Sequence, residues 1–138
     1  MAQTHLPEKW VERIAAICEI PMSHEVLRFF TAWQKSEGGN ATWNPLNTTN
    51  HVRSTAHGDW QTGDYNSVGV ANYNKAFEGV LATADTLLQD SFHDLVISLR
   101  HAKANGDTAE DLVKANRSEI SLWGTNPDTM LDVLKNVS

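Results

Sequence analysis

Apolar residues recur at the spacing of an amphipathic helix along the first 37 positions of the chain. A first predicted helix begins at Pro7 and ends before Pro21. A second begins after Ser23, a good N-cap residue, and runs to about Glu37. Its apolar row comprises Val26, Phe30 and Trp33. Because its aromatic residues lie in this row, we expect the second helix to form the centre of the core.

Helical spacing returns after Tyr73 with two long series of apolar residues. Asn74 is a candidate cap for a helix that spans 77–88. The next series covers 92–102 and ends at Asn105-Gly106, a pair that favours a helix C-terminus.

The last 31 positions predict shorter elements. Thr108 begins a helix with Asp111 at capping-box spacing, and Asn126-Pro127 opens a final helix. Between them, we expect residues 123–125 to form a loop that buries Trp123.

Residues 50–73 lack helical spacing. Gly58-Asp59 and Gly63-Asp64 indicate turns, so this region predicts a small, irregular β-hairpin. The fold class expected is therefore α+β and mostly α: two N-terminal helices, the hairpin, and three to four C-terminal helices.

Composition narrows the class of protein. The chain has 138 residues, 41% of them hydrophobic, which suits a single domain over 1–138. A net charge of -6 argues against nucleic acid as a partner. The single cysteine, Cys18, lies among apolar residues and is expected to fill core space. The sequence shows neither a signal peptide nor an apolar run of about 20 residues, so we expect cytoplasmic synthesis and no membrane contact.

Glu37 is the first candidate for chemistry. It continues the row of Val26, Phe30 and Trp33 at the end of the second helix, just before Gly38-Gly39. Burial on one side raises the pKa of a carboxyl group and suits it to act as a general acid. The alternative is that Glu37 lies past the buried turns with its carboxylate in water.

The loop after Glu37 is rich in Asn and Thr and carries Trp43. Amides and hydroxyls bind sugar hydroxyls, and a flat indole covers the apolar face of a sugar ring. The hairpin region adds Asp59 and Asp64. A protonated acid opposite a second carboxylate is the arrangement that cleaves a glycosidic bond. The alternative is that the segment is an ordinary polar surface loop without a sugar site.

Other site chemistries lack support in the sequence. His51, His57 and Asp59 match no zinc-ligand spacing, so we expect no metal and no cofactor. Cys18 has no motif of a nucleophile around it, and Gly38-Gly39 ends a helix rather than opening a phosphate-binding one.

Several segments stand in an order and spacing that together carry a resemblance. They are Ser36-Glu37-Gly38-Gly39, Asn44-Pro45-Leu46-Asn47-Thr48-Thr49, Tyr65-Asn66-Ser67-Val68-Gly69-Val70-Ala71-Asn72-Tyr73, Gly79-Val80 with Ala82-Thr83-Ala84, and Trp123-Gly124-Thr125. Between about 32 and 125 the chain resembles the lysozyme-like superfamily, and more narrowly its small phage and prophage domains.

The resemblance implies cleavage of the β-1,4 bond between N-acetylmuramic acid and N-acetylglucosamine, with Glu37 as general acid. Members of the superfamily use a second Asp, an Asp with a Thr, or the Glu alone. Asp64 is the first candidate and Asp59 the second, while Thr48 or Thr49 can position a water. Because the hairpin is irregular, we favour a water-using or Glu-only mechanism over a covalent one.

Substrate contacts are expected from the polar loop and the hairpin. The candidates are Trp43, Asn44, Trp60, Asn66, Ser67, Asn72 and Tyr73. The partner expected is the glycan strand of peptidoglycan, bound by a monomer at the cell wall or within a virion. The resemblance implies a muramidase or a lytic transglycosylase; the alternative is a non-catalytic phage protein of this fold, which the acidic charge also suits.

Overall fold

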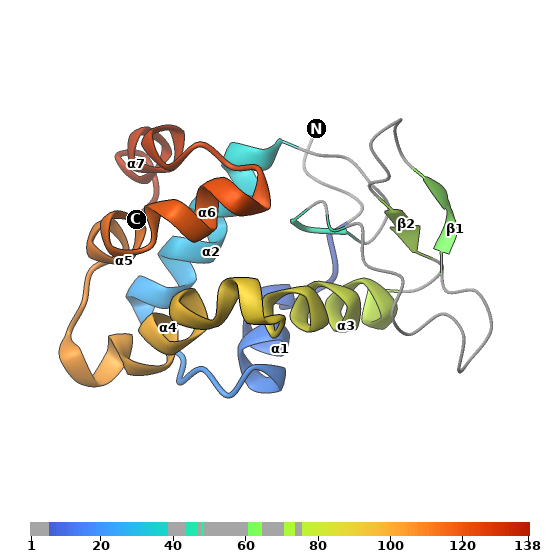
Figure 1. Cartoon of the computed structure of the whole chain (residues 1–138), viewed down its shortest axis with the longest axis horizontal. Helices are drawn as coiled ribbons and strands as arrows, with labels where there is room; N and C mark the ends of the chain where they lie inside the picture. Colours follow the sequence, from blue (N-terminus) through green and yellow to red (C-terminus); the bar gives the residue numbers. More distant parts are fainter. Residues whose placement is uncertain (1–5, 39–43, 47, 49–60, 65–70, 74–75) are drawn as a thin grey trace.

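The computed structural model describes residues 6–38, 44–46, 48, 61–64, 71–73 and 76–138, with the backbone alone for 61–64 and 71–73 (Figure 1). In chain order these form α1 (Trp10–Ile17), α2 (His24–Glu37), β1 (Gln61–Asp64), β2 (Ala71–Tyr73), α3 (Ala76–Leu87), the 3-10 turn η1 (Asp90–Phe92), α4 (His93–Asn105), α5 (Ala109–Ala115), α6 (Arg117–Trp123) and α7 (Pro127–Leu134). The described part of the chain is therefore mostly α, as predicted.

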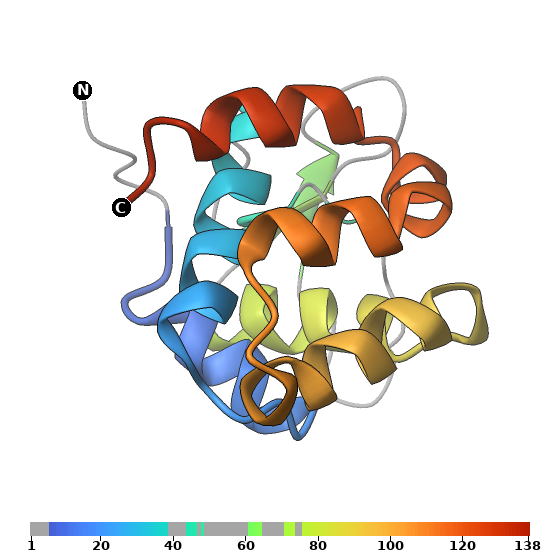
Figure 2. The same ribbon diagram turned by 90° about the vertical axis from the view of Figure 1, so that its left-hand side faces the viewer.

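Helix α2 occupies the centre of the molecule. It packs against α1, α4, α5 and α7, and the two views show α5 and α7 along one side of it (Figures 1 and 2). The side chains of Phe29, Phe30 and Trp33 are fully buried. Their rings also contact one another, with centroids 5.6 to 6.1 Å apart. The central position predicted for this helix is confirmed.

Local signals placed several helix ends correctly. The Ser23 hydroxyl accepts a hydrogen bond from the Val26 amide at 3.2 Å, and Gly106 ends α4 at φ 68°. Thr108 and Asp111 form the predicted capping box, and Asn126 caps α7. The Cys18 side chain is fully buried, and burial raises the pKa of its thiol to about 11.

Two predicted boundaries are wrong. Helix α1 begins at Trp10 rather than Pro7, because Lys9 takes a left-handed conformation with φ 51°. The loop predicted around Trp123 begins only after that residue, since 117–123 form α6. This helix has only seven residues, of which Ile120 is buried while Leu122 stays 62% exposed, so its apolar spacing is too short to recognise.

Strands β1 and β2 pair antiparallel, with Asp64 opposite Ala71 and Asn72 opposite Gly63. The pairing is irregular between Gln61 and Gly63. Helix α3 contacts β2 (Figure 1). The remainder of the region predicted as a hairpin lies outside the described residues.

Arg28 ties the N-terminal half of α2 to two later helices. Its guanidinium donates two hydrogen bonds of 3.1 Å to the Glu110 carboxylate on α5, and one of 2.7 Å to Glu25. It also donates to the backbone carbonyls of Leu134 and Val137, at and beyond the end of α7, at 3.2 and 2.9 Å. The hydrogen bonds from Arg28 hold the pKa of Glu110 below its ordinary value of 4.5. One side chain thus joins α2, α5 and the chain end.

We predict that Arg28→Met lowers the free energy of unfolding by about 2 kcal/mol, the range of one hydrogen bond to a charged group. The losses do not add, because the partly exposed Glu25 and Glu110 carboxylates regain water. Arg28→Lys should restore little, because an ammonium lacks the two-pronged geometry. The pKa of Glu110 is lowered in the folded state. The stability that the Arg28–Glu110 pair contributes is therefore present above pH 4.5 and is lost as the pH falls below that value.

Urea unfolding at pH 7 and pH 3 measures both effects. The control is Arg117→Met, which breaks the exposed ion pair with Asp128 and should cost less than about 1 kcal/mol. If Arg28→Met loses no more unfolding free energy than the control, the stabilising role of the Arg28 hydrogen bonds is contradicted.

Candidate functional site

Glu37 is the last residue of α2, and its side chain is half-buried. Val26, Phe30 and Trp33, the three residues that precede it in the same row, are fully buried. Gly38 ends the helix at φ 61°, a conformation that favours glycine, and its amide donates to the carbonyl of Gln34. The carboxyl group therefore stands where the core reaches the surface.

A threonine from the far end of the sequence contacts the Glu37 carboxylate. The Thr125 hydroxyl donates to Oε2 of Glu37 at 2.8 Å, and the same hydroxyl accepts the indole N–H of Trp33 at 2.8 Å. Thr125 is only 5% exposed and Trp33 is fully buried. Two side chains of the core thus orient the candidate acid.

Trp123 links this group to the segment that follows α2. Its ring lies against that of Trp33, with centroids 5.1 Å apart. Its indole N–H donates to the carbonyl of Leu46 at 2.7 Å. Because Leu46 is fully buried, the chain beyond Glu37 returns to the core within nine residues.

Asn44 and Thr48 shape that segment. The Asn44 amide donates to the Thr48 carbonyl at 2.8 Å and accepts from the Thr48 N–H at 2.9 Å, and Asn44 is 2% exposed. The Thr48 hydroxyl bonds that of Thr86 on α3 at 2.5 Å. In this structure Asn44 bonds the backbone of Thr48 and Thr48 bonds α3, while the sugar contact expected of Asn44 stays a prediction.

The remaining candidates are placed by backbone alone or not at all. Asp64 ends β1 opposite Ala71, the neighbour of Asn72 on β2, whereas Tyr73 lies opposite Gln61 at the other end of β1. The other predicted site residues fall outside the described part of the chain: Trp43, Thr49, Asp59, Trp60, Asn66 and Ser67.

Thr125 is the site residue that sequence reasoning did not single out. It lies 88 positions after Glu37, and no local pattern connects the two. In the sequence, Trp123-Gly124-Thr125 predicts a loop and forms part of the resemblance, but neither points to a role for Thr125. What marks Thr125 in the structure is its position between a buried indole and a carboxylate.

Glu78 is a second acid that the sequence analysis did not consider. It lies in the first turn of α3, is 5% exposed, and its Oε1 is a buried oxygen for which the described structure shows no hydrogen-bond partner. Glu78, Ala82 and Thr86 are spaced at i, i+4 and i+8, so they share one side of α3. Thr86 contacts Thr48 from that side.

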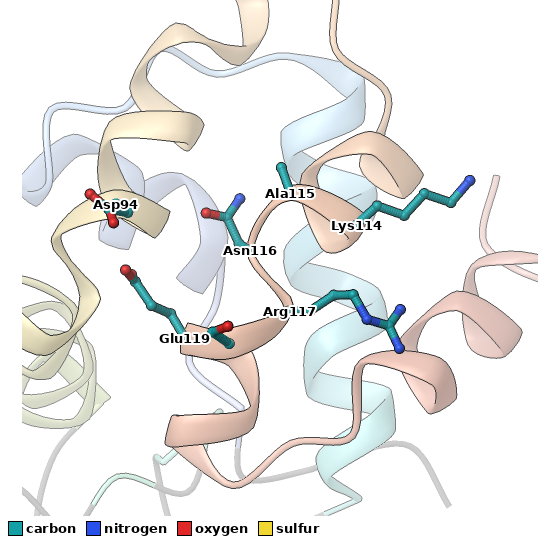
Figure 3. Close-up of a pocket in the computed structure, with 7 residues that line it drawn as sticks. Asp94, Lys114, Ala115, Asn116, Arg117 and Glu119 are labelled. Atoms are coloured by element: carbon teal, nitrogen blue, oxygen red, sulfur yellow. The ribbon is translucent and has the colours of Figure 1, made fainter.

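A pocket of about 380 Å³ lies where α4, α5 and α6 meet (Figure 3). Two of its polar side chains bond the backbone of neighbouring helices. The Glu119 carboxylate accepts the Leu95 amide at the start of α4 at 2.8 Å, and the Asn116 amide donates to the Leu112 carbonyl at 2.8 Å. None of the residues predicted for the site lines this pocket.

Within the described ranges, no group of three or more His, Cys, Asp or Glu residues is placed to hold a metal ion. In the same part of the chain, no helix combines the length and the apolar character that crossing a membrane requires.

Comparison of the chain with protein-family models, curated proteins and solved structures finds no match in any of the three.

We predict that Glu78→Leu raises the free energy of unfolding by about 1 kcal/mol. An unpartnered buried polar atom costs about 1–3 kcal/mol, and an apolar side chain of similar size removes that cost. Part of the gain is offset, because a carboxylate near a helix N-terminus contributes about 0.3–1 kcal/mol.

Urea unfolding measures the change, with Glu78→Gln as the matched control. The amide keeps an acceptor and adds two donors that need partners, so the control should show no gain. A Leu variant that is less stable than the wild type would contradict this account of Glu78.

Proposed function

We propose that this chain cleaves the β-1,4 bond between N-acetylmuramic acid and N-acetylglucosamine in peptidoglycan, with Glu37 as the general acid. The observation that carries the proposal is the position of Glu37: a half-buried carboxyl group at the end of the central helix, held by a buried threonine. The likeness of its flanking segments to the lysozyme-like superfamily supplies the substrate class. A lysozyme-like fold is part of the same proposal.

The chemistry requires a proton donor that is held in place next to the glycosidic oxygen. Glu37 gives its proton to this oxygen, and the bond from the oxygen to C1 of the muramic acid breaks with its electron pair on the oxygen. An attacking hydroxyl, from water or from the muramic 6-position, forms the new bond to C1. Its proton passes to the Glu37 carboxylate, which restores the acid.

The strand pair is the proposed opposite wall of the site. Asp64 ends β1, and Asn72 and Tyr73 lie on β2, which contacts α3. From the other side, α3 holds the segment after α2 through Thr86 and Thr48. Helix α3 thus connects both sides of the proposed cleft.

The protein is proposed to act as a monomer on glycan strands at the cell wall, free or as part of a virion, and to need no metal or cofactor. Its net charge of -6 weakens free attraction to an anionic wall, which favours delivery by a virion or release beside the wall during lysis.

We predict that Glu37→Gln lowers the rate of wall digestion by roughly 10²–10⁴-fold, the usual effect of losing a positioned general acid. The fold should persist, because the amide has the same size and its oxygen still accepts the Thr125 hydroxyl. Turbidity of a peptidoglycan suspension gives the rate, and far-UV circular dichroism confirms folding.

Glu12→Gln on the exposed side of α1 is the matched control and should digest at the wild-type rate. Mass spectrometry of the released fragments separates hydrolysis from 1,6-anhydro ends. A wild-type protein that digests no peptidoglycan would support the non-catalytic alternative, and an active Gln variant would remove Glu37 from the mechanism.

A further inference from the structure

The Thr125 hydroxyl has one hydrogen, and its neighbours decide where that hydrogen points. The indole N–H of Trp33 can only donate, so at 2.8 Å the Thr125 oxygen must accept from it. The hydrogen of Thr125 is then directed to Oε2 of Glu37, also at 2.8 Å. The chain of two hydrogen bonds has one direction, from the core toward the carboxyl group.

The backbone holds Thr125 in this place. Its amide donates to the carbonyl of Ile120 at 3.1 Å, and the Gly124 amide donates to that of Ser121 at 3.0 Å. These bonds form a Schellman motif at the end of α6, in which Gly124 takes the left-handed conformation at φ 109°. On the other side, the Trp33 ring is packed against Trp123. The two donors of the hydrogen-bond chain, Trp33 and Thr125, are therefore both held by contacts of their own.

We propose that Thr125 is a positioning residue that assigns separate roles to the two oxygens of Glu37. Oε2 accepts the Thr125 hydroxyl throughout, and Oε1 carries the proton that is transferred. A proton on Oε2 would weaken this oxygen as an acceptor. If that proton pointed toward Thr125, the bond would reverse and leave the Thr125 hydrogen without this partner. The inference rests on the proposed function, and it adds which atom of Glu37 meets the glycosidic oxygen.

The arrangement favours transfer in two ways. The carboxyl plane is held before substrate binds, so less reorganisation is needed when the proton moves from Oε1 to the leaving oxygen. After transfer, the negative charge spreads over both carboxylate oxygens, and the Thr125 hydrogen bond to Oε2 becomes charge-assisted. The hydroxyl therefore stabilises the carboxylate that forms as the bond breaks.

The test compares kcat and KM for a soluble muropeptide chain in Thr125→Val, in Thr125→Ser and in a double variant that combines Trp33→Phe with Thr125→Val. Thr125→Val keeps the shape and removes the hydroxyl, and kcat should fall roughly 10- to 100-fold with KM changed less than about twofold. Thr125→Ser keeps the hydroxyl and should retain most of kcat. Thr83→Val is the matched control, because it removes a buried hydroxyl that bonds the Gly79 carbonyl within α3.

The double variant Trp33→Phe with Thr125→Val separates positioning from folding. Thr125→Val alone leaves the Trp33 N–H buried without its partner and should lower the unfolding midpoint. Removing that N–H as well should recover part of the midpoint, while kcat stays low. Recovery of stability without recovery of kcat is the result expected of a positioning residue.

Three outcomes would overturn the inference. They are a Thr125→Val variant with wild-type kcat, a Ser variant as slow as the Val variant, and a double variant whose kcat recovers with its stability. Each of these leaves the proposed function standing, since the wild type is active in all of them. A wild type without activity on the same substrate would instead reject the proposed function and this inference with it.

Discussion

The hydrogen bond that Trp33 requires governs the arrangement around the candidate acid. A buried indole ring stabilises the core through its large apolar area, but its N–H must find an acceptor. The acceptor is Thr125, at 2.8 Å. Because the threonine hydroxyl then donates onward to Glu37, satisfying one polar atom of the core also orients a carboxyl group at its edge.

Helix α2 is secured at both ends by later parts of the chain. Near its beginning, Arg28 bonds the Glu110 carboxylate and two backbone carbonyls that lie more than 100 positions away. Near its end, Trp33 bonds Thr125 and packs against Trp123. The helix that ends in Glu37 thus depends on α5, α6 and α7 for its place. Changes in these helices, far from Glu37 in sequence, act on the proposed site through this helix.

Leu46 and Thr48, which follow α2, are bonded to later helices of the fold. Trp123 bonds the Leu46 carbonyl, and Thr48 bonds Thr86 on α3. Helix α3 also contacts β2, where Asn72 and Tyr73 lie. A substrate cleft needs its parts held in place if the acid is to meet one bond of a long chain. Under the proposed function, the helices supply this support and the strand pair supplies the opposite wall.

The sequence by itself determined the helices whose ends carry local signals. Ser23, Gly106, the Thr108 and Asp111 pair, and Asn126 all act on backbone groups within a few residues, so neighbouring letters suffice to predict them. It also placed Glu37 at the end of a buried row, because helical spacing is local. It missed α6, a seven-residue helix with too few apolar positions to show a period.

Only the tertiary structure decided which residues meet. The contact of Thr125 with Glu37 spans 88 positions and that of Arg28 with Glu110 spans 82, and both depend on how whole helices pack. Packing follows from the combined shape of many side chains, which no short pattern records. The sequence therefore identified the candidate acid, and the fold alone identified the threonine and the tryptophan that orient it.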